Sequence, residues 1–219
     1  MNILSPHMPD GVFEARLNFI KSRGCNCVHV FVCNKADGEY AGYSIYGKGI
    51  SWNIDKNYTS IMTKRIKRLR KEKLGVVLWL AADDSTDWNR ALIGNFQKYV
   101  NDIKSLGWFD YASTVVLGLE MDEYWNANQA AVASAAVRNT YKGKIGTHMT
   151  SGKYNYVNVA DILFYQTNPG KSASQIKSES QNIKAKVNKP VNFFELSRQE
   201  DRALSQAALD GGAFAVGNW

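Results

Sequence analysis

Continuous apolar runs alternate with segments of helical spacing along most of the chain. The runs lack a polar alternation, as expected for strands that are buried on both faces. They lie at Cys27–Cys33, Leu74–Ala81, Thr114–Leu119, Lys144–Met149, Asp161–Gln166, Pro190–Phe194 and Ala213–Trp219, and a stub at Asn2–Ser5 precedes them. Helices are predicted between the runs, at Gly11–Ser22, Thr59–Lys73, Asn89–Leu106, Asn128–Thr140, Ser174–Val187 and Gln199–Leu209. The pattern therefore predicts eight strands joined mostly by helices.

Two of the predicted helices have an apolar face that can be read from the spacing. The first is expected to bury Val12, Ala15, Phe19 and Ile20. The third is expected to bury Leu92, Ile93, Phe96, Val100 and Ile103. Both sets recur at intervals of three and four residues, which places their members on one side of a helix.

Strands separated by helices indicate parallel pairing with right-handed crossovers, and so an α/β fold. An open doubly wound sheet and a closed (β/α)8 TIM barrel both fit this order. No glycine-rich phosphate loop follows a strand, which weakens the nucleotide-binding open sheet. The strand count favours a compact barrel with its eighth helix missing, formed by residues 1–219 as one domain.

Composition and charge narrow the classes of partner. The 219 residues are 45% hydrophobic and carry a net charge of +7, much of it between Lys64 and Lys73. That basic stretch is interpreted as the solvated face of a helix, with an anionic surface as the alternative. No nucleic-acid motif accompanies it, and no apolar run reaches the ~20 residues of a membrane span. No signal peptide is recognisable, the localisation stays open, and the chain can be one part of a longer protein.

The carboxyl ends of the predicted strands carry acidic, amide and aromatic side chains. In a barrel of this kind the active site is built from these positions and the loops after them. The candidates are Asn34, Asp83, Trp88, Glu120, Trp125, His148, Tyr165, Asn168, Glu195 and Trp219. The set lacks a basic cluster for phosphate and a histidine–carboxylate group for a metal, so no metal and no cofactor are expected. Aromatic rings stack on sugars and the polar groups bond hydroxyls, so a carbohydrate substrate is predicted.

The positions of two glutamates support a specific resemblance. Glu120 ends the fourth predicted strand and Glu195 ends the seventh. This arrangement resembles the clan A retaining glycoside hydrolases, which include the family 5 cellulases and mannanases. The resemblance covers nearly the whole chain as topology and position, without a long identical stretch. It implies that Tyr165 bonds the nucleophile, that Trp219 floors the sugar site, and that His148 matches a histidine frequent near strand five.

The resemblance also implies a mechanism for cleaving a β-linked poly- or oligosaccharide. Glu120 is expected to be the acid/base and Glu195 the nucleophile. Retention of configuration needs the two carboxyl groups about 5–5.5 Å apart, whereas inversion needs ~6.5–9.5 Å. The acid must hold a proton near neutral pH, which requires a raised pKa, while the nucleophile stays ionised.

The chain departs from the pattern in two features, of which one is that the arginine typical of strand two is not evident, and several alternatives stay open. The clan usually has asparagine before the acid/base, where it bonds the sugar 2-hydroxyl, but this chain has Leu119. Asn34 is one polar residue that can substitute for it. Either glutamate can instead be a salt-bridged strand-end residue, and Asp122 or Glu123 can be the acid. At the level of function, the alternative is a catalytically inactive carbohydrate-binding barrel within a larger surface or phage-type protein. A barrel for small anionic metabolites is a weaker one.

Overall fold

The computed structural model describes residues 4–33, 42–82, 87–196 and 201–217, without the side chains of residues 87 and 88. Its strands form a seven-stranded parallel sheet in the order β1-β4-β5-β6-β7-β8-β9. The strands are β1 (Cys27–Phe31), β4 (Gly75–Trp79), β5 (Ala112–Val116), β6 (Lys144–Met149), β7 (Ile162–Tyr165), β8 (Val191–Phe193) and β9 (Ala215–Val216). A small antiparallel hairpin of β2 (Tyr43–Ser44) and β3 (Gly47–Lys48) follows β1.

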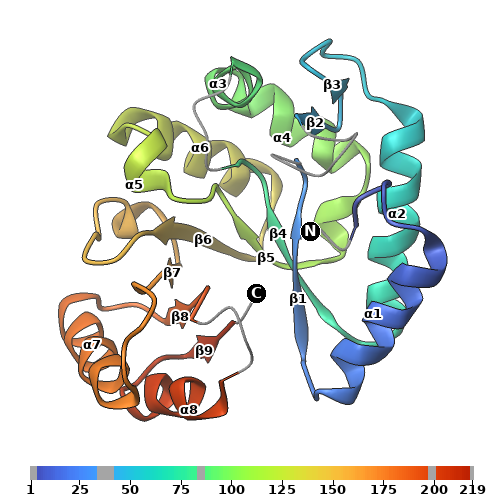
Figure 1. Ribbon diagram of the computed structural model, residues 1–219. Coiled ribbons are helices and arrows are strands. Elements are labelled where there is room, and N and C mark those ends of the chain that lie inside the picture. Colours follow the sequence, from blue (N-terminus) through green and yellow to red (C-terminus); the bar gives the residue numbers. More distant parts are fainter. Residues whose placement is uncertain (1–3, 34–41, 83–86, 197–200, 218–219) are drawn as a thin grey trace.

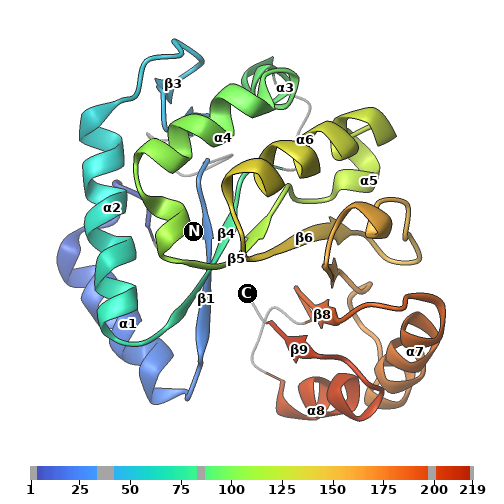
Figure 2. The ribbon, with the colours of Figure 1, turned by 180° about the vertical axis from the view of Figure 1, so that it is seen from behind.

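Helices connect the strands and lie on the outside of the curled sheet (Figures 1 and 2). They are α1 (Asp10–Ser22), α2 (Lys56–Lys71), α3 (Asp87–Gly94), α4 (Phe96–Ser105), α5 (Met121–Tyr124), α6 (Ala127–Thr140), α7 (Ala173–Lys186) and α8 (Arg202–Asp210). Two short 3-10 helices, Trp108–Asp110 and Val157–Val159, complete the connections. The predicted alternation of strand and helix is confirmed.

Ring contacts inside the sheet show that it is strongly curled. His29 of β1 stacks on Phe194, just after β8, with 4.7 Å between ring centroids and 7° between planes. β1 is one edge of the sheet and β8 is next to the other edge, so only a strongly curled sheet brings these rings together. The barrel part of the prediction is confirmed by this contact.

The interior of the barrel is filled by an aromatic and aliphatic group that we call the interior cluster. Its buried members are Val77, Trp79, Val116, Ile162, Phe164 and Phe194, and Cys27, Phe31 and Leu119 pack against them. Gly146 of β6 makes room for this packing, because a Cβ there would lie 2.5 Å from the Phe164 ring. Trp79 is fully buried here. The interior is therefore a packed core, as in other barrels of this type.

A second core lies between the sheet and the helices, and it corrects one predicted helix face. The main apolar cluster includes Phe13 and Leu17 of α1. The predicted face of that helix was wrong, because Val12 is 42% exposed and Phe19 is 63% exposed. The predicted residues follow an i, i+3, i+7 spacing as well, but the helix turns its Phe13–Leu17 side to the core. The predicted face of the third helix is buried, although α3 and α4 are separated at Asn95.

The ends of the chain differ from the prediction in one respect. Residues 2 and 3 of the predicted first strand lie outside the described part. Leu4 and Ser5 are buried in a turn rather than in a strand. No helix follows β9 among the residues described up to 217.

The basic stretch on α2 is used for packing against α1. Lys64 and Arg65 pair with Asp10 at 2.8 and 3.1 Å, and Arg68 pairs with Glu14 at 3.0 Å. Arg65 is buried and also donates to the backbone carbonyls of Leu4 and Met8. Much of the positive charge thus has carboxylate or carbonyl partners, which favours the structural interpretation of this stretch. None of the described helices is long and apolar enough to cross a membrane.

Candidate active site

The two predicted catalytic glutamates sit where β5 and β8 leave the sheet. The backbone N–H of Leu119 still donates to the carbonyl of Ala81 at 3.2 Å, and that of Leu196 donates to Gly217 at 3.1 Å. Glu120 and Glu195 each lie next to these last inter-strand bonds, and both side chains are half-buried. They therefore occupy the strand-end positions that the sequence predicted.

Both glutamates have left-handed backbone. Glu120 has φ 42° and ψ 48°, and Glu195 has φ 60°. Among the described non-glycine residues, only Trp52 and Lys73 share a positive φ with them. A side chain in this region costs roughly 1–2 kcal/mol, so it persists only where the surrounding structure enforces it. Such strain is concentrated at functional sites, and here it falls on the two predicted acids.

The left-handed backbone changes where the two carboxylates can point. In a regular strand successive side chains alternate between the two faces of the sheet. Leu119 and Phe194 both belong to the interior cluster. Strict alternation would therefore send Glu120 and Glu195 to the helix side of the sheet. The positive φ values interrupt that alternation at both residues.

His148 of β6 holds the backbone of Glu120. Its Nδ1 accepts a hydrogen bond from the Glu120 backbone N–H at 2.8 Å. The ring is 0% exposed, and its edge contacts Trp79 and Phe194 at centroid distances of 5.4 Å. The prediction that His148 contacts substrate is therefore corrected, because an enclosed ring cannot reach a sugar. It positions Glu120 instead.

Burial keeps both interior histidines neutral. It lowers the pKa of His148 to about 3, with the nearby His29 as a second cause, and it lowers the pKa of His29 to about 4. Nδ1 of His29 accepts a hydrogen bond from the indole N–H of Trp79 at 3.1 Å, so this core histidine has a partner. Since Nδ1 of His148 is an acceptor, its proton sits on Nε2, which has no hydrogen-bond partner among the described residues.

Tyr165 does not bond Glu195. Its hydroxyl donates to Glu179 of α7 at 2.9 Å and accepts from the N–H of Gly152 at 2.7 Å. Tyr165 belongs to the core between the sheet and the helices, whereas its neighbour Phe164 belongs to the interior cluster. This part of the prediction was wrong because alternation along β7 turns the tyrosine to the helix side.

Trp125 is also a core residue rather than a sugar platform. It is 6% exposed and packs edge-on against Phe96 of α4, with 5.6 Å between centroids. Its ring lies directly over Gly118, where a Cβ would come within 2.7 Å of it. The prediction of substrate contact at Trp125 is therefore corrected, since the ring fills the space between β5 and the helices.

The remaining predicted substrate residues are placed only in part. Asn34, Asp83 and Trp219 lie outside the described residues. Trp88 is in α3, and its side chain is not described. Asn168 is exposed on the loop that follows β7. Leu119, at the place of the expected asparagine, packs against the interior cluster and cannot bond a sugar hydroxyl.

Three polar residues that the sequence did not single out for these roles tie the strand-end loops together. Asp122 accepts from the backbone N–H and the hydroxyl of Thr150 at 2.9 and 2.5 Å, joining α5 to the end of β6. Asn89 donates to and accepts from the backbone of Ala82 after β4. The third of these residues is Glu179 of α7. Both carboxylate oxygens of Asp122 are engaged, which favours a structural role over that of the acid. The only sequence signal for such a hydrogen-bonded link between loops is an acidic residue one helical turn after the end of a strand.

The Glu179 carboxylate collects donors from two loops. Thr167 donates at 2.5 Å and Lys171 at 2.6 Å, in addition to Tyr165. Burial alone would raise the pKa of Glu179, but the bonds from Lys171, Thr167 and Tyr165 outweigh it and lower that pKa below its ordinary value. Burial raises the pKa of Tyr165 to about 12, so its hydroxyl stays a donor. The network fixes the loops after β6 and β7.

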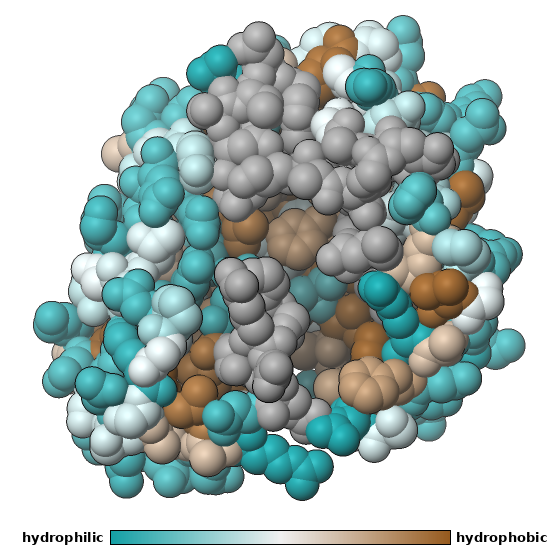
Figure 3. Space-filling model, in the orientation of Figure 1, coloured by the Kyte–Doolittle hydropathy of each residue, from teal (hydrophilic) through white to brown (hydrophobic). Residues whose placement is uncertain are grey.

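The surface of the molecule is hollowed at the end of the barrel where the strands leave the sheet. On the face seen in Figure 1, hydrophilic residues dominate the rim and hydrophobic residues are visible in a central hollow (Figure 3). Within the described part of the chain, no group of three or more His, Cys, Asp or Glu side chains is placed to hold a metal ion.

Comparison with known proteins relates the fold to one class of enzyme. No family model and no curated protein sequence matches the chain. Among solved structures, it is similar to the endo-1,4-β-mannanase from Rhizomucor miehei, with 13% identity and a TM-score of 0.72 over 100% of this chain and 84% of that chain. The endo-1,4-β-mannanase from Eisenia fetida has 16% identity and a TM-score of 0.69 over 97% of this chain and 78% of that one.

A third similar structure is the GH53 catalytic domain from Ignisphaera aggregans, with 13% identity and a TM-score of 0.65 over 93% of this chain and 76% of that one. The structural neighbours are (β/α)8 glycoside hydrolases, and this chain has their barrel fold. The predicted resemblance is confirmed at the level of the fold. At these identities the roles of individual residues depend on the geometry of the strand ends described above.

Proposed function

We propose that this chain is a glycoside hydrolase that cleaves β-linked poly- or oligosaccharide with retention of configuration. The observation that carries the proposal is the left-handed backbone at both strand-end glutamates. Strain of this kind is retained where it serves a site. The barrel fold shared with mannanases and related enzymes supports the same assignment.

In the first step Glu195 attacks the anomeric carbon, and the bond from that carbon to the glycosidic oxygen breaks. Glu120 gives its proton to the leaving oxygen, which departs as an alcohol. In the second step Glu120, now a carboxylate, takes a proton from water. That water attacks the anomeric carbon and displaces Glu195 as a free carboxylate.

His148 contributes to this chemistry through Glu120 rather than through substrate. Its Nδ1 accepts a hydrogen bond from the Glu120 backbone N–H, so the backbone that carries the acid keeps one position through both steps. Fixed placement of a catalytic group lowers the entropic part of the barrier. Asn34, Asp83, Trp88, Asn168 and Trp219 remain the proposed substrate contacts around the mouth.

A second candidate function is a carbohydrate-binding barrel without turnover, and Leu119 favours it. The residue packs inward where the resemblance expects an amide that bonds the sugar 2-hydroxyl. That contact strengthens in the transition state and supplies several kcal/mol in related enzymes. Its loss weakens catalysis more than ground-state binding.

Turnover on a substrate panel separates the two functions. The panel includes β-1,4-mannan, β-1,4-galactan, β-glucan and an aryl β-glucoside, together with chitin and peptidoglycan. The structural neighbours include β-1,4-mannanases, β-1,4-galactanases and a β-glucosidase. We expect release of reducing ends from at least one polymer. Glu120→Gln and Glu195→Gln should each lower the rate by about 10²–10⁴-fold or more with an unchanged melting temperature.

Glu123→Gln is the matched control, because Glu123 is exposed on α5 three residues from Glu120. It should keep the wild-type rate. Full activity in either Glu120→Gln or Glu195→Gln contradicts the assigned roles. Binding of a polymer without any release of reducing ends supports the non-catalytic barrel.

A further inference from the structure

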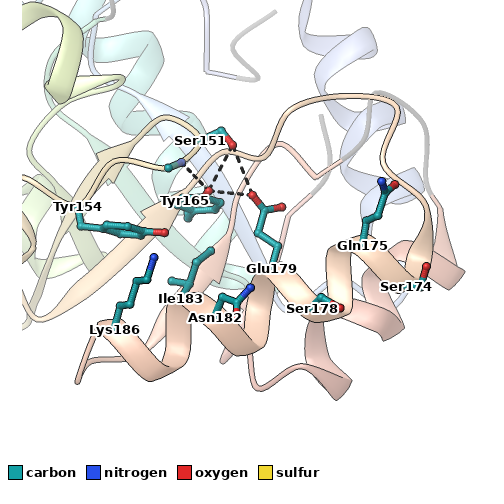
Figure 4. A pocket seen from close by; sticks show the side chains of 11 residues that line it. Ser151, Tyr154, Tyr165, Ser174, Gln175, Ser178, Glu179, Asn182, Ile183 and Lys186 are labelled. Carbon is teal, nitrogen blue, oxygen red and sulfur yellow. Dashed lines mark hydrogen bonds between the residues drawn. The ribbon is translucent and has the colours of Figure 1, made fainter.

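A groove of about 430 Å³ lies on the outside of the barrel, between α7 and the loop after β6. Figure 4 shows its lining. Ser151, Gly152 and Tyr154 come from the loop, Tyr165 ends β7, and the remaining side chains form one stripe along α7. The groove does not contain either of the proposed catalytic glutamates.

The floor of the groove is rigid. Glu179 projects from α7 toward Tyr165 and Ser151, and the hydrogen bonds among them are drawn in Figure 4. Its other partners, Thr167 and Lys171, belong to the loop after β7. A carboxylate with this many donors has little capacity left for a ligand. Glu179 therefore shapes the groove, and the residues at the rim of the groove are the ones that can bind a ligand.

The rim presents polar groups that the protein itself leaves without a partner. Among the described residues, the side chains of Ser178 and Asn182 and the hydroxyl of Tyr154 make no hydrogen bond. Ser178 and Asn182 are exposed and lie four residues apart, so they sit on one line along α7. Gln175 extends the same line toward the N-terminus of the helix. These groups offer both donors and acceptors.

An aromatic ring stands at the other end of the groove. Tyr154 is half-buried and nearly parallel to Tyr165, with 6.3 Å between centroids and 10° between planes. The ammonium of Lys186 lies 5.6 Å from the Tyr154 centroid, and Figure 4 shows that Lys186 points toward this ring. An exposed contact of this kind is worth only about 0.5–1 kcal/mol. A ligand can displace it, and the ring face that attracts a cation also attracts the electropositive C–H face of a pyranose.

The chemistry of the lining selects among ligand classes. Ile183 is the only aliphatic side chain that lines the groove, so an apolar ligand or an amphipathic helix has little to bury against. The charged side chains are Glu179 and Lys186, which balance each other and do not favour an anion. Hydroxyl and amide groups beside one aromatic face suit a neutral, polyhydroxylated ligand.

One of the loops that line the groove follows β6, at the end of the barrel that carries the proposed catalytic glutamates. Ser151 follows β6 by two residues, and its neighbour Thr150 is bonded to Asp122 in α5, directly after Glu120. A polymer that leaves the mouth over the loop after β6 would therefore reach the groove without crossing the molecule.

We propose that this groove is a second carbohydrate-binding site, in which a pyranose stacks on Tyr154 and its hydroxyls bond Ser178 and Asn182. The inference rests on the proposed function for the identity of the polymer, a neutral β-linked polysaccharide. The site holds the chain outside the catalytic mouth and takes no part in bond cleavage.

Retention of the protein in native gels that contain β-1,4-mannan, β-1,4-galactan or β-glucan tests the site. The parent is the full chain with Glu120→Gln and Glu195→Gln, so that the polymer is not consumed. Tyr154→Ala and the double variant Ser178→Ala, Asn182→Ala should each weaken retention about tenfold, equivalent to about 1.4 kcal/mol. Gln181→Ala is the control, since Gln181 is exposed on α7 outside the groove.

The double variant changes only exposed positions, so it carries the test if Tyr154→Ala fails to fold by circular dichroism. Retention equal to that of the parent in the double variant overturns the inference. Hydrolysis by the unmodified chain is measured separately. Absent hydrolysis with groove-dependent retention overturns the proposed function alone, whereas hydrolysis with groove-independent retention overturns the second site alone.

Discussion

The backbone N–H of Glu120 donates a hydrogen bond to Nδ1 of His148, with 2.8 Å between the two nitrogens. This bond joins a residue that follows the end of β5 to the second-to-last residue of β6, and His148 is enclosed by aromatic rings. It fixes a glutamate whose backbone is left-handed. The placement of the proposed acid therefore depends on a residue that does not touch substrate.

Replacing His148 should lower catalysis without abolishing it. His148→Phe keeps an aromatic ring but removes the acceptor, which leaves the Glu120 N–H unpaired at a cost of about 1–3 kcal/mol. We expect kcat to fall by roughly 10-fold or more, with a smaller change in KM. His148→Asn places an oxygen near the position of Nδ1 and should recover part of the rate. Steady-state kinetics on one soluble substrate measure both.

A purely structural role for His148 would give a different result. In that case His148→Phe and His148→Asn would differ in melting temperature but would share the wild-type kcat once folded. Equal kcat values in the two variants and the wild type contradict the positioning role.

Because Glu195 has a left-handed backbone, we expect its glycine variant to be more stable than its alanine variant, the reverse of the order in a helix. Glycine adopts positive φ without strain, whereas alanine keeps the Cβ clash, which costs roughly 1–2 kcal/mol. Glu195→Gly should therefore be more stable than Glu195→Ala by about 1 kcal/mol in urea unfolding, although both lack activity. Glu120→Gly and Glu120→Ala should show the same order.

Glu123 in α5 supplies the opposite control. There alanine is the better helix former, by about 1 kcal/mol over glycine. If the alanine variants are the more stable at Glu120 and Glu195 too, the backbone strain assigned to these positions is absent.

Two buried neutral histidines make stability depend on pH. Burial holds the pKa of His29 at about 4 and that of His148 at about 3, below the ordinary value of 6.5. As the pH falls below 6.5 the unfolded chain gains protons that the folded chain does not, so stability is lost with falling pH and is flat above it. Each histidine should contribute a slope of up to about 1.4 kcal/mol per pH unit.

Urea unfolding between about pH 5 and pH 8 measures this slope before carboxylates begin to titrate. His148→Phe removes one of the two shifted histidines and should reduce the slope by up to about 1.4 kcal/mol per pH unit. A stability that stays constant from neutral pH down to about pH 5 contradicts the buried neutral state of both rings.

Removing the Glu179 carboxylate should loosen the loops after β6 and β7. Glu179→Ala leaves Tyr165, Thr167 and Lys171 without their acceptor, and unpaired half-buried donors cost roughly 1–3 kcal/mol. Hydrogen exchange should become faster at Gly152, whose N–H bonds the Tyr165 hydroxyl. Gln181→Ala, on the exposed side of the same helix, should change neither quantity. Unchanged exchange at Gly152 in Glu179→Ala means that the network does not hold the loop.

The fold was predictable from the sequence because each strand is a continuous apolar run. Such runs are expected only in parallel sheets covered on both faces, and their order implies crossovers through helices. Glu120 and Glu195 could be proposed as the acids because the ends of those runs can be read directly. The exposed Val12 and Phe19 on α1 were not predicted, since two apolar stripes on one helix satisfy the same spacing.

The local environment of the site was less predictable for physical reasons. Tyr165 turns outward because of alternation along a strand whose register is set by its neighbours, and its partner Glu179 comes from the following helix. The backbone N–H of Glu120 is bonded by His148, 28 residues away, and this contact cannot be read from the composition of either segment. Trp125 is a core residue because Gly118 admits its ring, a contact that no local pattern indicates.

The anomeric form of the first product tests the central claim most directly. Proton NMR during hydrolysis of a soluble β-1,4-mannan or the best polymer of the panel resolves the newly released reducing end before it equilibrates. With Glu195 as nucleophile and Glu120 as acid/base, two displacements at the anomeric carbon must release the β-anomer first. Initial release of the α-anomer, or the β-anomer formed at an undiminished rate by Glu195→Gln, would contradict the account.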